Sequence, residues 1–180
     1  MMLLMTSPQG TTGSKLKKIA WDLAFWGLLI FALYRQVPLW WKSNAQEGKS
    51  IDAFYAKDLG GERVTLPENG KKTVFVLWAT WCGPCHAQLA QFKKAVEDGS
   101  LPPDRIVALS VGEAIETVRA YREKEALPFR VLADPEGISS SRFSFSVTPT
   151  IVFVDQQAKI STFLQGLSPL AVTRAKGFLD

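Results

Sequence analysis

The sequence of 180 residues predicts an α/β fold built on one central sheet. The run Thr73–Ala79 is continuous in apolar, β-branched and aromatic residues, as is typical of a buried central strand, and Ile106–Val111 is predicted as a second buried strand. A helical pattern lies between them, and patterns typical of β-hairpins stand before and after this strand–helix–strand unit. Two hairpins that bracket such a unit predict a layered α/β domain over residues 51–180.

Turn residues define the two predicted hairpins. The predicted strands and turns are Ala53–Tyr55 and Arg63–Leu66 around Asp58–Gly61, and Thr150–Val154 and Lys159–Leu164 around Asp155–Gln157. A shorter extended piece is predicted at Phe129–Ala133, directly before a turn at Asp134-Pro135. These strands would extend the central pair on both sides.

Three helices are predicted in this domain. The first follows the cysteine pair and carries its apolar stripe at Leu89, Phe92 and Val96. It can end at Gly99, and the second helix is predicted over Glu113–Glu125. In the last helix, Ser168 is the expected N-cap and Pro169 is expected in the first turn.

The formal net charge of +4 comes from the N-terminal part of the chain. From residue 46 onward, 16 Lys and Arg residues balance 16 Asp and Glu residues. The first 45 residues contain one acidic residue, Asp22, and five basic ones: Lys15, Lys17, Lys18, Arg35 and Lys42. A nucleic-acid-binding protein would carry its basic excess on the folded body, so no nucleic-acid partner is expected.

The basic residues flank an apolar run, Ile19–Val37, which is long enough as a helix to approach the thickness of a bilayer. We therefore predict a cytoplasmic tail (1–18), a transmembrane anchor (19–38) and a linker (39–50). The lysines before the run favour a single-pass protein of the cytoplasmic membrane, with the domain on the extracytoplasmic, periplasmic side. A signal peptide cleaved near Ser43-Asn44-Ala45 and an amphipathic surface helix are the alternatives.

Cys82 and Cys85 are the only cysteines, and they stand where the first central strand gives way to a helix. A bridge across so short a loop removes little chain entropy, so its value is not stability. At a helix N-terminus, Cys82 would have its thiolate stabilised, which makes it the expected nucleophile. Cys85 lies one turn further on and is the expected resolving thiol, while Gly83 and Pro84 shape the link.

Pro149 stands at the entry to a strand that is predicted to be central. Since proline cannot donate to a sheet ladder, this residue must avoid it. A plain turn proline and a cis Thr148–Pro149 bond both satisfy that requirement, and the residues alone leave the two open.

The segment Phe75–Cys85, with Trp81-Cys-Gly-Pro-Cys85 at its end and Thr148-Pro149-Thr150 downstream, resembles thioredoxin. It is most similar to the membrane-anchored extracytoplasmic branch, the TlpA/ResA-like and suppressor-of-copper-sensitivity-like proteins. This resemblance covers residues 50–180 and implies a thioredoxin fold with an N-terminal β-hairpin extension. It further implies that Trp81 shapes the active site, that Pro149 is cis and packs against the cysteines, and that Thr148 offers backbone groups to a substrate.

One position departs from thioredoxin. Cytoplasmic thioredoxin has a buried aspartate six residues before the first cysteine, where it serves proton transfer at the resolving thiol, and Val76 stands there in this chain. Deprotonation of Cys85 would then need another group. Glu113, which resembles an acid placed near the site in some relatives, and water are the two candidates; the simpler interpretation of Glu113 is a helix-start carboxylate.

The pentad Cys82–His86 also matches the c-type haem attachment pattern. His86 is the only histidine, and all methionines precede the apolar run, so a sixth haem ligand has no obvious source. A zinc site would need a second pair of ligands. We therefore expect no cofactor and no metal, and His86 is expected to be a solvent-facing helix residue.

Together these observations predict a protein thiol–disulfide oxidoreductase. The Gly83-Pro84 dipeptide matches reducing thioredoxin, so the predicted activity is reduction of protein disulfides in substrates such as apocytochrome c. A disulfide-forming oxidase of the same fold is the alternative. Because no flavin or nicotinamide motif is present, a membrane protein is the expected electron donor or acceptor.

Overall fold

The computed structural model describes residues 21–32, 46–68 and 70–180. Residues 21–32 are helical and lie within the apolar run. In these described ranges, no helix has both the length and the hydropathy that a membrane crossing requires. The predicted tail (1–18), both ends of the predicted anchor and most of the predicted linker lie outside the described residues.

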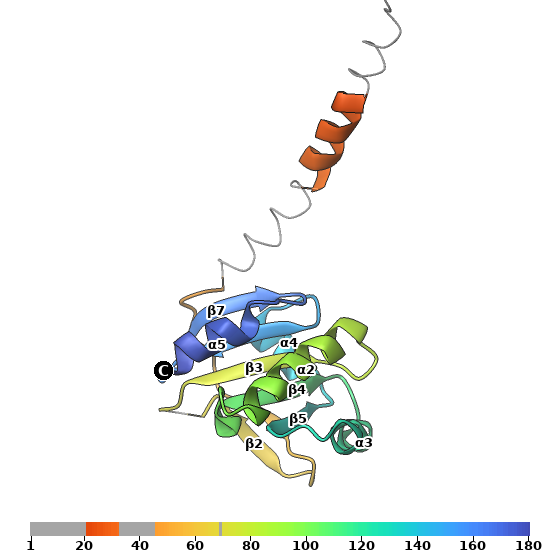
Figure 1. Ribbon diagram of the computed structural model, residues 1–180. Helices are drawn as coiled ribbons and strands as arrows, with labels where there is room; N and C mark the ends of the chain where they lie inside the picture. Colours follow the sequence, from red (N-terminus) through yellow and green to blue (C-terminus); the bar gives the residue numbers. More distant parts are fainter. Residues whose placement is uncertain (1–20, 33–45, 69) are drawn as a thin grey trace, which may run out of the picture. The chain divides into compact units, whose positions relative to one another are not determined.

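The folded body from Gln46 onward contains a seven-stranded sheet with the order β2-β1-β5-β4-β3-β6-β7 (Figure 1). The strands are β1 (Phe54–Lys57), β2 (Arg63–Leu66), β3 (Thr73–Trp78), β4 (Ile106–Val111), β5 (Arg130–Asp134), β6 (Thr150–Val154) and β7 (Ile160–Gln165). Strands β3, β4 and β5 are parallel, whereas the two hairpins β1–β2 and β6–β7 are antiparallel to their neighbours. The predicted layered domain with an N-terminal hairpin is confirmed.

Strand positions agree with the sequence to within one or two residues. The predicted first strand, Ala53–Tyr55, lies slightly later, at Phe54–Lys57, because Asp58 accepts backbone N–H bonds from Gly60 and Glu62 and so fixes the turn. The predicted extended piece Phe129–Ala133 is shifted by one residue in the same direction.

The sheet separates two hydrophobic clusters because successive side chains of a strand point to opposite faces. Val74, Val76 and Trp78 of β3 face one cluster, and Phe75 and Leu77 face the other. Helices α2 (Gly83–Glu97), α3 (Ile115–Glu125) and α5 (Ala171–Leu179) cover the first face, and α4 (Ile138–Phe143) covers the second. Figure 1 shows α2 and α5 in front of the sheet and α4 behind it.

Two helical predictions need correction. Ser168 is not an N-cap: α5 begins at Ala171 with Leu170 in the capping position, and no side chain caps it. Pro169 therefore lies before the helix and not in its first turn. The Ser168 N–H donates to Gln88 Oε1 of α2, at 2.9 Å, which makes Ser168 part of the connection between the helices. The predicted second helix begins at Ile115, two residues after Glu113.

Helix α4 was not predicted. Its sequence is serine-rich, and serine has a modest helix propensity. The buried Asp134 carboxylate accepts hydrogen bonds from the backbone N–H groups of Ile138 and Ser139 and from the Ser139 hydroxyl. A side chain outside the helix therefore supplies the N-terminal hydrogen bonds that the local pattern lacks.

The two ends of the parallel strands have different surroundings. We call the carboxyl ends of β3 and β4 the site end, and the amino ends of β3, β4 and β5 the far end. The chain enters the folded body at the far end: Gly48 N–H donates to Ile160 O, and Ser50 forms a β-bridge with Lys159 of the β6–β7 turn. That turn follows Val154, whose partner in the ladder is Thr73, the first residue of β3.

Candidate active site

The two cysteines lie at the site end of the central strand. Strand β3 ends at Trp78, and a turn closed by a hydrogen bond from Cys82 N–H to Ala79 O, at 3.2 Å, leads into α2. Cys82 is the N-cap residue of α2, and Pro84 stands within the first two helical positions, where its missing N–H costs nothing. The predicted placement of Cys82 at a helix N-terminus is thus confirmed.

Cys82 and Cys85 form a disulfide with their Cα atoms 5.3 Å apart. Cys82 is 5% exposed and Cys85 is fully buried, so a partner reaches the bridge through Cys82. When the bridge is reduced, the unpaired N–H groups and the positive end of the helix dipole stabilise a thiolate on Cys82. The roles of Cys82 as nucleophile and Cys85 as resolving thiol stay predictions.

The Thr148–Pro149 loop lies against the disulfide. The Thr148–Pro149 bond is cis, as the resemblance to thioredoxin implies, and Pro149 is buried. Cys82 Sγ lies 3.6 Å from the Thr148 carbonyl oxygen. The pairing of Thr150 with Leu77 in the β3–β6 ladder brings this loop beside the end of β3. The backbone of Thr148 is therefore next to the reactive sulfur, where a bound polypeptide would meet it.

Glu113 lies in the loop between β4 and α3 and points to the turn before the cysteines. Its carboxylate accepts hydrogen bonds from Thr80 N–H at 2.9 Å, from the Thr80 hydroxyl at 2.5 Å and from the Ser110 hydroxyl at 2.5 Å. The interpretation as a helix-start carboxylate is wrong, because α3 begins at Ile115 with Ala114 as its N-cap. The role of Glu113 as proton acceptor for Cys85 stays a prediction.

His86 lies on the first turn of α2, next to the resolving thiol. It is exposed as predicted, but its Nε2 lies 2.8 Å from the Thr80 carbonyl oxygen. Its ring lies 5.1 Å from that of Tyr121 on α3, which in turn contacts Trp78 at 4.8 Å. Burial, with a smaller contribution from the Glu125 charge, raises the pKa of Tyr121 to about 12, so this phenol is neutral at physiological pH.

The position that corresponds to the thioredoxin aspartate is closed to solvent. Val76 is fully buried in the same cluster as Cys85, Trp78 and Leu89. An apolar residue here means that the resolving thiol is surrounded on this side by hydrocarbon. Among the described residues, no group of three or more His, Cys, Asp or Glu side chains could hold a metal ion.

Sequence reasoning missed Thr80 and Ser110. Both stand at or just after the ends of the central strands, and both donate hydroxyl hydrogen bonds to Glu113. The available signal was a hydroxyl residue two positions before Cys82 and another three positions before Glu113. In parallel strands such positions meet at one edge of the sheet, so the contact could have been anticipated. Gly83 and Trp81 are where they were expected, and Trp81 is 75% exposed.

Known proteins similar to this chain include thiol-disulfide oxidoreductases. The chain is 29% identical over 121 residues to the "Thioredoxin-like protein YneN" of Bacillus subtilis, which covers 64% of this chain and 69% of that protein. It is 25% identical over 126 residues to "Thiol-disulfide oxidoreductase ResA" of the same organism, covering 69% and 70% of the two chains.

Solved structures share the fold. The crystal structure of StoA from Bacillus subtilis matches with a TM-score of 0.60 and 21% identity, over 72% of this chain and 97% of that one. A thio-disulfide isomerase from Thermus thermophilus matches with a TM-score of 0.58 and 25% identity, over 72% and 93%. The body is therefore a thioredoxin-like α/β domain, as predicted.

A family model described as Redoxin matches residues 46–174, which is most of the chain. This match, the relatives named thiol-disulfide oxidoreductases and the Cys82–Cys85 disulfide identify the protein as a thiol–disulfide oxidoreductase. The chain belongs to the Redoxin family.

Proposed function

We propose that this protein is a membrane-anchored, extracytoplasmic reductase of protein disulfides. The observation that carries the proposal is the position of the Cys82–Cys85 pair at the N-terminus of α2, with Cys82 Sγ 3.6 Å from the Thr148 carbonyl oxygen. A redox-active pair with one reachable sulfur, beside the backbone of the Thr148–Pro149 loop, is suited to a polypeptide substrate.

The reaction transfers two electrons and two protons. The Cys82 thiolate attacks one sulfur of the substrate disulfide, and the displaced substrate sulfur leaves as a thiolate that takes up a proton. Cys85 loses its proton, and its thiolate attacks Cys82 Sγ in the mixed disulfide, so the second substrate sulfur leaves and is protonated. The substrate is then a dithiol and the protein holds the Cys82–Cys85 bridge. A dithiol protein of the membrane reduces that bridge for the next cycle.

The reducing direction is supported by the Gly83-Pro84 dipeptide, which matches reducing thioredoxin. A disulfide-forming oxidase is the second candidate. Alkylation trapping of the two cysteines in cells, combined with the reduction potential of the purified full-length protein, decides between them. A reductase is mainly dithiol in cells and has a potential near that of thioredoxin, about −270 mV. A pair that is mainly oxidised in cells, with a potential near −120 mV like that of DsbA, would establish the oxidase instead.

The location is proposed from the sequence. The lysines before the apolar run 19–37 and the neutral body after it support an N-terminus in the cytoplasm and a domain outside. Labelling of intact cells with a membrane-impermeant thiol reagent tests this, since Cys82 and Cys85 are the only cysteines. When the cells are first treated with a reductant so that both cysteines are thiols, labelling before lysis supports the proposal, and labelling only after lysis contradicts it.

Substrates such as apocytochrome c are proposed from the resemblance to the extracytoplasmic branch. Their thiols must be reduced before haem can be attached, which requires a reductase of this kind outside the cytoplasm. A Cys85→Ser variant retains the nucleophile and should hold substrates as mixed disulfides. Identification of the trapped proteins by mass spectrometry tests the substrate class, and trapped proteins without apocytochromes among them would exclude that substrate.

A further inference from the structure

The reactive cysteine ends a short turn whose two inner residues are not buried, whereas its first and last residues, Ala79 and Cys82, belong to the hydrophobic core. Residues 79–82 connect the buried strand β3 to α2, and the hydrogen bond from Cys82 N–H to Ala79 O joins the two ends of this turn. Trp81, directly before Cys82, has a side chain that is 75% exposed, so it does not fix the turn by burial. The other residue within the turn is Thr80.

All of the polar atoms of Thr80 are engaged by residues from other elements. Its N–H and its hydroxyl donate to the two carboxylate oxygens of Glu113, from the β4–α3 loop. Its carbonyl oxygen lies 2.8 Å from Nε2 of His86, on the first turn of α2. The turn leaves these groups without partners of its own, and Glu113 and His86 supply the hydrogen bonds from two sides.

Both partners of Thr80 are themselves held in place. The Ser110 hydroxyl, at the end of β4, donates to the same carboxylate of Glu113. The His86 ring packs against Tyr121, and Tyr121 packs against the fully buried Trp78. The contacts therefore connect the turn to β4, to α2 and to α3.

We propose that His86 and Glu113 are positioning residues for Cys82, acting through Thr80. Neither residue has to touch the substrate: together they hold the turn so that Cys82 Sγ stays at the helix N-terminus and next to the Thr148 carbonyl. The inference rests on the proposed function, because the step it concerns is the attack of the Cys82 thiolate on a substrate disulfide. It also gives the Cys-x-x-Cys-His pentad a use other than haem attachment.

The first experiment removes the His86 hydrogen bond from the full-length protein. His86→Ala lacks both the donor and the ring, whereas His86→Gln keeps an N–H donor. Lys94→Ala, at an exposed position further along α2, is the matched control. The readouts are the rate of Cys82 alkylation by iodoacetamide across pH, and the kcat and KM for reduction of a protein disulfide.

Loss of one hydrogen bond changes a free energy by about 0.5–1.5 kcal/mol, so we expect His86→Ala to slow alkylation and kcat between about twofold and tenfold. The pH at which alkylation is half-maximal should rise, because the thiolate is stabilised less. His86→Gln should restore most of both quantities. Wild-type rates and an unchanged pH profile in His86→Ala, or equal losses in His86→Gln and His86→Ala, would overturn the role of His86.

The second experiment separates positioning from proton transfer at Glu113. Thr80→Val has nearly the same shape as the wild type and removes the hydroxyl donor while leaving the Glu113 carboxylate intact. If Glu113 positions the turn, Thr80→Val and Glu113→Gln both slow alkylation of Cys82. If it serves only as proton acceptor for Cys85, Thr80→Val behaves like the wild type, and Glu113→Gln slows only the resolving step and accumulates mixed disulfide. That second outcome contradicts the proposal for Glu113.

The wild-type protein separates failure of this inference from failure of the proposed function. If the wild-type protein reduces no protein disulfide, the proposed function is wrong, and there is no reaction for which Cys82 could be positioned. A wild type that is active, with His86 and Thr80 variants equally active and equally alkylated, would refute the inference alone. Thermal unfolding of each variant is measured alongside, so that a loss of fold is not mistaken for a loss of positioning.

Discussion

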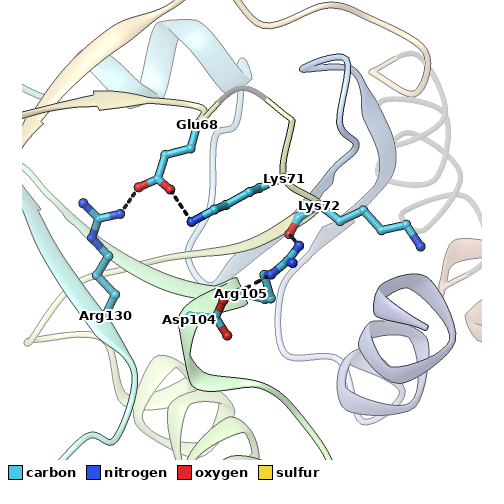
Figure 2. Close-up of polar contacts among 6 residues, drawn as sticks. All are labelled: Glu68, Lys71, Lys72, Asp104, Arg105 and Arg130. Carbon is cyan, nitrogen blue, oxygen red and sulfur yellow. Dashed lines mark hydrogen bonds and ion pairs between the residues drawn. The ribbon is translucent and has the colours of Figure 1, made fainter.

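The two ends of the sheet hold polar contacts of different kinds. At the site end, one carboxylate and one imidazole bind the backbone and hydroxyl of Thr80, close to a buried disulfide. At the far end, Glu68 lies between Arg130 and Lys71, and Arg105 pairs with Asp104 and donates to the Lys72 carbonyl oxygen (Figure 2). Both groups join segments that are distant in the sequence.

The difference lies in what each group of contacts restrains. The far-end ion pairs join long side chains that are about one-third exposed or more, and such pairs contribute roughly 0–1 kcal/mol each. The site-end contacts restrain the backbone two residues before the nucleophile. The far-end ion pairs thus lie away from the disulfide, whereas the hydrogen bonds to Thr80 lie beside it.

The largest effects are expected at the cysteines. Cys82→Ser should abolish disulfide exchange, because it removes the attacking thiolate, and Cys85→Ser should accumulate a mixed disulfide with substrate. Activity assays and non-reducing gels measure both outcomes. If the two variants lost activity equally and neither trapped a complex, the roles assigned to the two sulfurs would be wrong.

Substitutions of Val76, at the centre of the sheet, should lower the stability of the protein. Val76→Asp places an unpaired carboxylate in a fully buried site and should lower the free energy of unfolding by about 3–5 kcal/mol. Val76→Thr, which keeps the shape and adds only a hydroxyl, should cost about 1–3 kcal/mol. Denaturant unfolding gives both values. A Val76→Asp variant as stable as the wild type would show that water or a partner reaches this position.

A smaller, purely functional effect is expected at Trp81. Since its side chain is 75% exposed, Trp81→Ala should change stability by no more than about 0.5 kcal/mol. It should raise the KM for a protein disulfide while leaving the rate with a small aromatic disulfide unchanged. An equal loss with both substrates would place Trp81 among the residues that hold Cys82 rather than those that contact substrate.

The smallest effect is expected at the far end. The hydrogen bond from Arg130, with a smaller contribution from Lys71, lowers the pKa of Glu68 below its ordinary value of 4.5. A lowered folded pKa means that the stabilisation is complete above pH 4.5 and is lost as the pH falls through the folded pKa. Glu68→Gln should therefore cost less than about 1 kcal/mol at neutral pH and nothing in strong acid.

Activity is the control for this last variant, and Glu62→Gln, at an exposed position on the first hairpin, is the matched substitution. Glu68→Gln should reduce disulfides at the wild-type rate. A fall in activity without a fall in stability would show that the contacts of Glu68 at the far end affect the reaction at the site end.

Most of the fold could be predicted from the sequence because its central strands are buried along nearly their whole length. Thr73–Trp78 and Ile106–Val111 consist mainly of apolar residues, and both are found within one residue of the predicted bounds. The errors occur where a side chain outside the element, near it in the sequence or far from it, takes part in hydrogen bonds at the start of a helix. Asp134, four and five residues before its partners, provides the N-terminal hydrogen bonds of α4, and Gln88 of α2 accepts a hydrogen bond from the Ser168 N–H ahead of α5.

The site could be predicted only in part. The positions of Cys82 and Cys85 follow from a strand that turns into a helix, which is a local pattern. The contacts of Thr80 with Glu113 and His86 depend on how β3, β4 and α2 are arranged around one turn. Periodicity contains no information on such contacts, and only the resemblance to relatives drew attention to Glu113.

The entry of the chain at Gly48–Ile51 has a mechanical consequence. Its backbone bonds to the β6–β7 turn lie beside the first residues of β3, and Cys82 follows the other end of that strand, about 17 Å away. A pull on the chain upstream of Gln46 is therefore transmitted to an outer hairpin and not to the turn that holds the nucleophile. Force applied where the chain enters would thus act on one end of the domain, and the disulfide lies at the other.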